Sequence, residues 1–144
     1  MKRDAGTRTY LPSAVVLGIC LVAQGAFAGG LLSKAQQDVV DAQIAKLRTS
    51  EERTIASEWS DAKKAAEFMC RPVALNELKK WNKDADRVFL GTDDPDTLDL
   101  TTNRLLTGSG QVRTGYDWTP FTFDCVLDPE SGKALSFEAN FASQ

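Results

Sequence analysis

The chain has 144 residues, 42% of them hydrophobic and 26% charged, with three cysteines and no histidine. This composition is typical of a folded globular domain and excludes a disordered or collagen-like chain. The formal net charge of −3 excludes the strongly basic footprint of a nucleic-acid-binding protein. The lack of histidine removes the commonest general base and metal ligand, which disfavours nucleophilic catalysis and a metal site.

The first 28 residues are organised like a signal peptide. Lys2, Arg3 and Arg8 form a basic start, an apolar run covers 14–23, and Ala26-Phe27-Ala28 supplies the small-x-small pattern of a signal peptidase site. We therefore expect cleavage after this motif and a periplasmic or secreted mature chain of 116 residues. Cleavage changes the net charge from −3 to −5, which further disfavours binding to nucleic acid or anionic lipid.

The same segment has two alternative interpretations. A retained membrane anchor needs about 18–20 apolar residues. The run over 14–23 is shorter, so we expect no stable membrane span after cleavage. A lipoprotein would be acylated at Cys20, but the residue before it, Ile19, is not small as such a site requires. Both alternatives are therefore disfavoured.

Cys70 and Cys125 remain after cleavage. In an exported chain this pair predicts a disulfide, because the periplasm and the exterior are oxidising. In the chain-entropy model, closing a loop of this length contributes about 4 kcal/mol to stability. The alternative is a catalytic thiol, but the chain offers neither a histidine to activate it nor a Cys-x-x-Cys pair.

Two capping boxes, Ser33 with Gln36 and Thr49 with Glu52, predict helix starts. Apolar residues follow at spacings of three and four: Val40, Ile44 and Leu47, then Ile55, Trp59, Ala62, Ala66 and Met69. Because the two stripes share a phase, the region 33–69 is either one helix or two. The stripe predicts packing against a core, and the alternative is a seam between copies of the chain.

Pro72 suits the first turn of a third helix that ends near Asn82. Its apolar side is formed by Ala74, Leu75, Leu78 and Trp81. We expect Arg71 to be non-helical, because a residue before proline disfavours helical geometry. The apolar period then changes to two, which predicts a short strand over 87–90 and a longer, glycine-interrupted strand over 105–113.

The C-terminal part predicts an antiparallel hairpin. A first strand over 121–127 and a second over 133–141 flank the turn 128–132, where proline fixes φ and glycine accepts a positive φ. One face of the first strand carries Phe121, Phe123, Cys125 and Leu127, and one face of the second carries Leu135, Phe137, Ala139 and Phe141. These faces are predicted to be buried and the opposite faces to be exposed to solvent.

These elements predict a small α+β fold, with two or three helices packed on a three- or four-stranded antiparallel sheet. The Cys70–Cys125 bridge would join the helical layer to the sheet and compensate for a limited core. We expect a signal peptide over 1–28, an N-terminal helical arm over 29–48 and a disulfide-linked α+β domain over 49–144.

Two motifs resemble ligand sites without meeting their requirements. The acidic cluster Asp93, Asp94, Asp96 and Asp99 suggests calcium, but Pro95 interrupts the alternation of oxygen ligands that a calcium loop needs. We therefore expect a solvated acidic loop and no metal. The glycines of 108–115 are spaced differently from a dinucleotide-binding fingerprint and lead into a strand, which predicts a glycine-relaxed strand or bulge.

Arg113, Tyr116 and Trp118 form the candidate binding surface. Arginine, tyrosine and tryptophan dominate the hot spots of binding interfaces, and these three lie close together before a strand. The favoured interpretation is nevertheless a turn whose aromatic side chains cover the open end of the core. No other cluster is a stronger candidate.

We expect the protein to be non-enzymatic. Carboxylate pairs or a Ser-Lys pair can support hydrolysis without histidine, but a chain of 116 residues with one thin sheet leaves little room for a substrate cleft. No catalytic residue and no cofactor are assigned.

Several of these residues resemble those of a known family. They are Cys70, Ala74, Leu75 and Leu78, then Trp118, Phe121, Phe123 and Cys125, and finally Leu135 and Phe137. The pattern over about 50–141 is similar to the small exported bacterial proteins catalogued as domain of unknown function 930. The resemblance implies a proteobacterial envelope origin. It assigns no catalytic residues to this chain, because the family has no established activity. The chain departs from the family in its longer helical arm before Thr49.

We therefore expect an exported binding or interaction module whose partner is an envelope protein or a cell-wall component. One alternative is a homo-oligomeric structural module that uses the stripe Val40–Met69. Another is a small inhibitor of a cell-wall enzyme that inserts the loop Gly115–Pro120 into a cleft.

Overall fold

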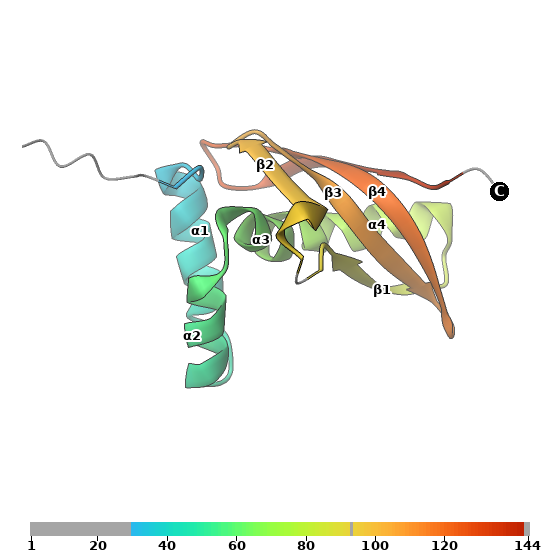
Figure 1. Ribbon diagram of the computed structural model, residues 1–144, viewed down its shortest axis with the longest axis horizontal. Helices are drawn as coiled ribbons and strands as arrows, with labels where there is room; N and C mark the ends of the chain where they lie inside the picture. The colour runs from blue at the N-terminus through green and yellow to red at the C-terminus, as the bar shows by residue number, and fades with distance from the viewer. Residues whose placement is uncertain (1–29, 93, 143–144) are drawn as a thin grey trace, which may run out of the picture.

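A computed structural model of the protein describes residues 30–92 and 94–142. The predicted signal peptide, including Cys20, lies outside the described residues. The helical elements are α1 (Lys34–Ile44), α2 (Ser50–Glu58), α3 (Asp61–Ala65), the π-helical segment η1 (Ala66–Cys70), α4 (Arg71–Trp81) and a short 3₁₀ turn, η2 (Pro95–Thr97). The strands are β1 (Ala85–Leu90), β2 (Leu98–Thr102), β3 (Leu105–Thr114), β4 (Asp117–Leu127) and β5 (Ala134–Asn140) (Figure 1).

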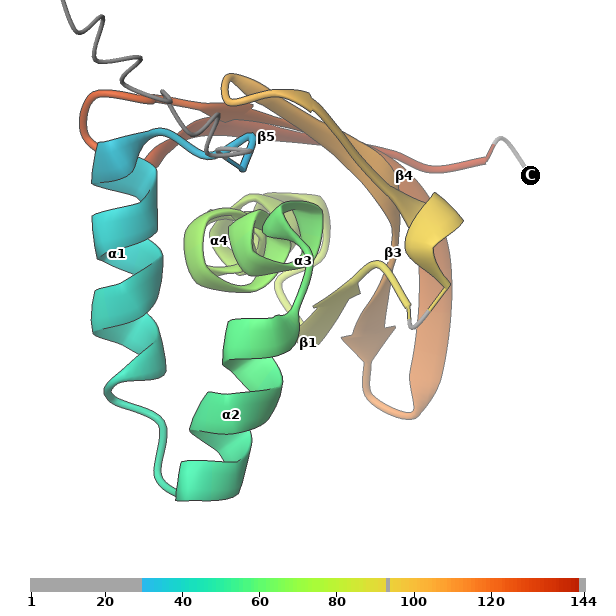
Figure 2. The same cartoon turned by 60° about the vertical axis from the view of Figure 1, so that its left-hand side comes forward.

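The strands form one antiparallel sheet in the order β1-β3-β4-β5. The sheet curls around the helix built from α3, η1 and α4, and α1 lies to one side of that helix (Figure 2). We call the face toward this helix the inner face and the opposite face the outer face. The predicted α+β fold with an antiparallel sheet is confirmed.

β2 was not predicted, and it shares an edge of the sheet with β1. Both strands pair with β3, because Leu90 lies opposite Gly110 and Leu98 lies opposite Gly108. The segment 91–97 leaves this edge after β1 and returns to it at β2. Since the other edge of β3 is fully paired with β4, β1 and β2 act as one interrupted strand.

The region 33–69 contains two breaks in its helical structure. Both predicted capping boxes are formed, and they start α1 and α2 as separate helices. A second break follows at Trp59, which is extended with ψ of 151°, and the side chain of Ser60 then caps α3. The prediction of an unbroken helix from Thr49 to Met69 is therefore wrong. Ser60 competes with helix continuation because its hydroxyl satisfies a free backbone N–H at a new helix start.

The prediction that Arg71 is non-helical is also wrong. Arg71 has helical angles, φ −55° and ψ −41°, and its N–H donates to the carbonyl of Ala66 in a wide π-type turn. A proline normally clashes with the carbonyl four residues earlier, and for Pro72 that carbonyl belongs to Phe68 in the wider turn of η1. The helix therefore continues from α3 through η1 into α4.

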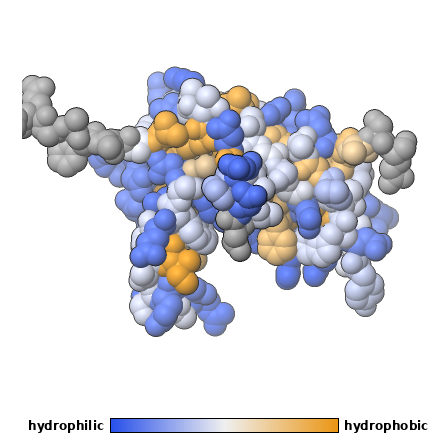
Figure 3. Space-filling model, in the orientation of Figure 1, coloured by the Kyte–Doolittle hydropathy of each residue, from blue (hydrophilic) through white to orange (hydrophobic). Residues whose placement is uncertain are grey.

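The core lies between this helix and the inner face of the sheet. Its largest fully buried apolar side chains are Phe123, Leu78, Leu90, Leu106, Leu127, Val40, Val88 and Val112. The apolar stripe packs into this core at Val40, Ala66 and Met69, as predicted. Ile55 is an exception, because it is 57% exposed on α2, where Figure 3 shows an apolar patch. The break at Trp59 turns α2 away from the axis of the following helix (Figure 2).

The predicted hairpin is present as β4 and β5, with one residue placed wrongly. Phe137, Ala139 and Phe141 contribute to the core as expected, but Leu135 is 66% exposed. Leu127 lies opposite Ala134 whereas Val126 lies opposite Ser136, so Leu135 is the extra residue of a β-bulge. A bulge shifts the alternation by one residue, which turns Leu135 outward.

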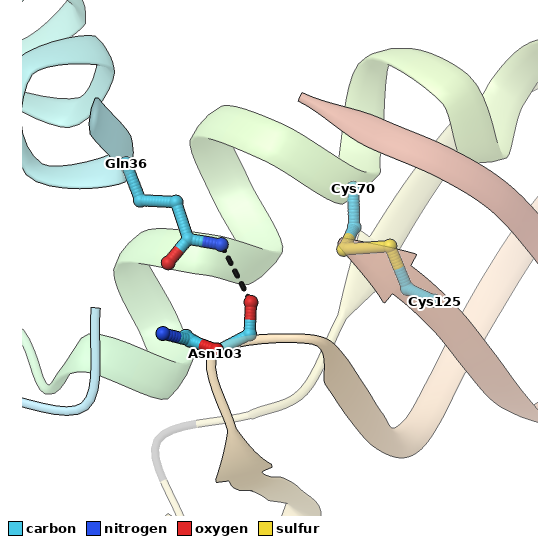
Figure 4. Close-up of a disulfide and its surroundings, with 4 residues drawn as sticks. All are labelled: Gln36, Cys70, Asn103 and Cys125. Carbon is cyan, nitrogen blue, oxygen red and sulfur yellow. Dashed lines mark hydrogen bonds between the residues drawn. A yellow bond between two sulfur atoms is a disulfide. The ribbon is translucent and has the colours of Figure 1, made fainter. Parts of the chain in front are cut away.

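The predicted disulfide joins Cys70 and Cys125 with their Cα atoms 6.1 Å apart. Cys70 ends η1 and Cys125 lies on the inner face of β4, and both are fully buried. The bridge therefore ties the central helix to the middle of the sheet (Figure 4).

α1 packs on the turns of the sheet rather than standing apart as an arm. Gln36 is fully buried, and its side-chain N–H group donates to the carbonyl of Asn103 at 2.6 Å (Figure 4). The hydroxyl of Ser33 donates to the carbonyl of Pro129 at 2.6 Å. These bonds connect α1 to the β2–β3 and β4–β5 turns. The described part of the predicted arm, residues 30–48, therefore shares the core of the region predicted as the domain.

We expect Gly132→Ala to lower the free energy of unfolding by more than the about 1–2 kcal/mol that a left-handed alanine costs. Gly132 has a φ of +69°, and an added Cβ would lie 2.8 Å from the carbonyl oxygen of Ala35. Gly115→Ala is the matched control, because its φ is +62° and nothing lies near its added Cβ. Urea unfolding of both variants isolates the contact with α1. Equal losses would show that this contact contributes nothing.

Candidate functional site

An aromatic pair lies on the outer face of the sheet. Phe89 of β1 and Trp118 of β4 stack with their ring centroids 5.1 Å apart and their planes 18° from parallel. The two residues come from strands on opposite sides of β3, where Arg113 is the register partner of Trp118. Phe89 is 45% exposed and Trp118 is 38% exposed. The pair is therefore accessible to a ligand while its rings support each other.

Arg113 packs beside Trp118 of this pair, and its own position is fixed by an ion pair with Asp86. Its guanidinium donates two hydrogen bonds, of 2.9 and 2.8 Å, to the two carboxylate oxygens of Asp86. Its central carbon lies 5.8 Å from the centroid of the Trp118 ring. These hydrogen bonds lower the pKa of Asp86 and raise the pKa of Arg113. A bidentate ion pair fixes orientation, so Arg113 supports Trp118 in one geometry.

Tyr116 lies apart from the other two predicted residues. Thr114 pairs with Asp117, so Gly115 and Tyr116 form a two-residue turn between β3 and β4. Gly115 has a φ of +62°, as the first central position of such a turn requires. Tyr116 is fully exposed at the tip and covers no part of the core. The structure thus brings Arg113 and Trp118 together and leaves Tyr116 as an outlying contact.

A hollow of about 290 Å³ adjoins Phe89 on the outer face. Its described lining consists of Phe89, Gly91, Thr92, Ser109, Gly110, Gln111, Pro120 and Phe121. Gly110 and Phe121 are register partners on neighbouring strands, and the side chain of Phe121 points to the inner face. The backbone of these two residues therefore forms the floor of the hollow. Phe89, Gln111 and Pro120 belong to the next row and form one wall. The hollow is a shallow site between two rows of outward-pointing residues.

We name the candidate site the outer aromatic surface and define it as Phe89, Arg113, Tyr116 and Trp118 together with the hollow beside Phe89. The sequence did not identify Phe89, Ser109 or Gln111 as members. The strand alternation at 87–90 was the available signal, because it places Phe89 on the face opposite Val88. The proximity of Phe89 to Trp118 depends on the pairing of β1 with β3.

The acidic cluster is divided between a local turn and β2, and two glycines of the segment 108–115 lie in β3. Asp94 accepts a hydrogen bond from the N–H of Asp96 in a local turn, and Asp99 lies in β2. Asp93 is outside the described residues. Within 30–92 and 94–142, no group of three or more histidine, cysteine or acidic residues could hold a metal ion. Gly108 and Gly110 lie in β3.

A second charged cluster lies on the central helix. Glu67 accepts hydrogen bonds from both Lys63 and Arg71, each at 2.8 Å. The ammonium of Lys63 also lies 3.4 Å from the carbonyl oxygen of Leu90 and 5.7 Å from the Trp59 ring. These contacts fasten the helix to the end of β1. The charges of the cluster therefore have a structural role in holding the edge of the sheet.

The candidate site is therefore an open sheet face that bears an aromatic pair and a small hollow. No family model, no curated protein and no solved structure matches this chain. The resemblance to domain of unknown function 930 therefore stays a prediction from the sequence. None of the helices in the described ranges combines the length and apolar character that crossing a bilayer requires.

The ion pair beside Trp118 predicts a stability change in acid. Because folding lowers the pKa of Asp86 below its ordinary value of 3.8, its contribution is present above that value and is lost as the pH falls through the lowered pKa. We expect the melting temperature of the wild type to fall more than that of Asp86→Asn between about pH 5 and pH 2. Asp84→Asn is the control, because Asp84 forms no ion pair within the described residues. Parallel curves for the wild type and Asp86→Asn would contradict the prediction.

Proposed function

We propose that this protein is an exported binding module of the bacterial cell envelope, which recognises its partner without catalysing a reaction. Three features support the proposal. The N-terminal 28 residues are typical of a signal peptide. The buried Cys70–Cys125 disulfide is compatible with an oxidising compartment. The chain contains no histidine, so histidine-based acid–base catalysis is absent.

The observation that carries the proposal is the Phe89–Trp118 stack on the outer face. Large aromatic side chains usually contribute to the core, yet these two are exposed. Arg113, paired with Asp86, packs over Trp118, and Trp118 stacks on Phe89. A surface kept in a fixed geometry before binding loses less conformational freedom when its ligand arrives. The stack therefore favours a role in recognition over a role in stability.

The other candidate functions are supported by less of the structure. A homo-oligomeric module would use the stripe Val40–Met69, but Val40, Ala66 and Met69 are buried and only Ile55 is strongly exposed. An inhibitor would insert the turn at Gly115, and Tyr116 at its tip is the residue available for that contact. The inhibitor is a specific form of the binding function, because it uses the same end of the outer aromatic surface.

We expect Trp118→Ala to remove most binding to an envelope partner while the chain stays folded. The side chain is 38% exposed, so its loss removes contact area without opening the core. The immobilised chain beginning at Gly29 is incubated with a total envelope fraction containing membrane proteins and cell-wall fragments. The retained components are quantified by mass spectrometry and by assay of amino sugars.

Val126→Ala is the matched control for this experiment. Val126 lies on β4 like Trp118, points to the same outer face and has the same exposure of 38%. We expect components that the wild type retains to be retained by Val126→Ala and lost with Trp118→Ala. Identical retention by all three proteins would contradict the proposed function.

A further inference from the structure

The hollow beside Phe89 has a lining suited to an uncharged polar ligand. None of its described lining residues carries a charge. The Asp86–Arg113 ion pair on the same face is closed on itself through two hydrogen bonds. Arg87, which is also exposed on β1, does not line the hollow. A phosphate, a nucleic acid or an anionic lipid would need an available cation, and this hollow presents none among the described residues.

Two of the three polar side chains that line the hollow, those of Ser109 and Gln111, are available to a ligand, whereas the hydroxyl of Thr92 accepts a hydrogen bond from the N–H of Asp94 at 3.1 Å. The side chains of Ser109 and Gln111 make no hydrogen bond to other side chains or to backbone within the described part of the chain. Both residues lie on β3, two positions apart, and therefore point to the same face. A hydroxyl both donates and accepts, and a carboxamide presents one acceptor and two donors. Together they match the hydroxyl and acetamido groups of a sugar.

The aromatic wall supplies the other half of such a site. One face of a sugar ring is lined with C–H groups, which pack against the electron-rich face of an aromatic ring. Phe89 borders the hollow directly, and Trp118 extends the aromatic surface beyond it. The volume of about 290 Å³ lies at the lower limit of small-molecule pockets, which suits one ring of a longer chain lying across an open face.

We propose that the hollow beside Phe89 binds a sugar ring of a neutral glycan, with Phe89 stacking on the ring and Ser109 and Gln111 hydrogen-bonding its polar groups. This inference rests on the proposed function, since it names the partner of the same outer aromatic surface. The ligand of the hollow is then an uncharged or N-acetylated polysaccharide and not a protein.

The test measures binding of soluble oligosaccharides to the chain beginning at Gly29. Chitotetraose and maltotetraose represent acetylated and non-acetylated neutral glycans, and oligogalacturonate represents an anionic one. Amide chemical shifts are recorded during each titration. We expect at least one neutral oligosaccharide to shift resonances of β1 and β3 around Phe89, Ser109 and Gln111. Oligogalacturonate should bind at least about tenfold more weakly, because none of the described residues that line the hollow is a cation.

Variants test whether the hollow itself is the site. Gln111→Ala and Phe89→Ala should each weaken neutral-glycan binding about tenfold or more, and Ser109→Tyr should abolish it by filling the hollow. Ser136→Ala on β5 is the control and should leave affinity within about twofold. Melting temperatures of all variants establish that they are folded. A fully folded Ser109→Tyr that binds like the wild type would overturn the proposal.

The outcomes separate this inference from the proposed function. If neither neutral oligosaccharide binds at millimolar concentration, the glycan inference is overturned. The proposed function then stands when envelope components are still retained by the wild type and lost with Trp118→Ala. Stronger binding of oligogalacturonate than of the neutral sugars also overturns the inference. Failure of both experiments would remove the outer aromatic surface as a binding site.

Discussion

Replacing Cys70 or Cys125 with serine is expected to lower the free energy of unfolding by about 2–5 kcal/mol. The disulfide closes a loop of 55 positions and restricts the unfolded chain, and its sulfur atoms also occupy the core between η1 and β4. Small domains have total stabilities of about 5–15 kcal/mol, so this loss is a large share of the total. Urea denaturation of the oxidised chain beginning at Gly29, with and without each substitution, measures it.

A serine at either site also leaves a hydroxyl and an unpaired thiol in a fully buried environment. The double variant Cys70→Ala/Cys125→Ala avoids both and isolates the effect of the cross-link. Wild-type protein reduced in denaturant and refolded in reductant supplies an independent comparison, because the buried bridge is shielded in the folded state. Equal stabilities of the oxidised and reduced chains would show that the bridge contributes nothing.

Phe123→Ala is expected to destabilise the fold by about 3–5 kcal/mol. Phe123 is 1% exposed, stacks on Phe137 with ring centroids 5.1 Å apart and lies near Phe121 in an edge-on arrangement. Its register partner on β3 is Gly108, which has no side chain to fill the space. Removal of the ring therefore leaves a cavity at the centre of the curled sheet.

Phe89→Ala is the matched control for this substitution, because it removes the same side chain from the outer face. We expect its effect on the free energy of unfolding to be about 1 kcal/mol or less, since an exposed ring leaves no cavity. Thermal and urea unfolding of both variants give the comparison. Losses of equal size would mean that Phe89 belongs to the core, and the outer aromatic surface would then need another explanation.

The features predicted correctly from the sequence depend on short-range interactions. The capping boxes at Ser33 and Thr49 act over three residues, so they identify helix starts without knowledge of the fold. The break at Ser60 was obscured because an apolar stripe continues across it. Ser60 followed by Asp61 is nevertheless a helix-start signal, and the hydroxyl of Ser60 accepts from Lys63.

Features set by pairing between distant segments were harder to predict. The bulge that exposes Leu135 exists because Leu127 pairs with Ala134. The alternation of apolar residues along one strand does not predict which residue of the next strand lies opposite. β2 alternates over only five residues beside the acidic loop, and its pairing with β3 completes it as a strand. In both cases the tertiary partner decides the local structure.

Only part of the candidate site was predicted, because its other residues are brought together by pairing between distant strands. Arg113 and Trp118 are close in sequence and face each other in register on neighbouring strands. Asp86 and Phe89 come from β1, which precedes them by more than twenty positions and meets them through the β1–β3 pairing. The sequence therefore indicated one side of the surface. The curled sheet supplied the stacking partner and the hollow.

At the interrupted edge of the sheet, part of the rim of the hollow lies outside the paired strands. β1 and β2 are each anchored to β3 by their own pairing, and the segment 91–97 between them contributes Gly91 and Thr92 to the rim of the hollow. A longer segment here costs little closure entropy and leaves the register on both sides unchanged. Insertions at this place can therefore remodel the rim while the core stays the same. The fold offers one position at which new binding preferences can evolve, or be engineered, almost independently of folding.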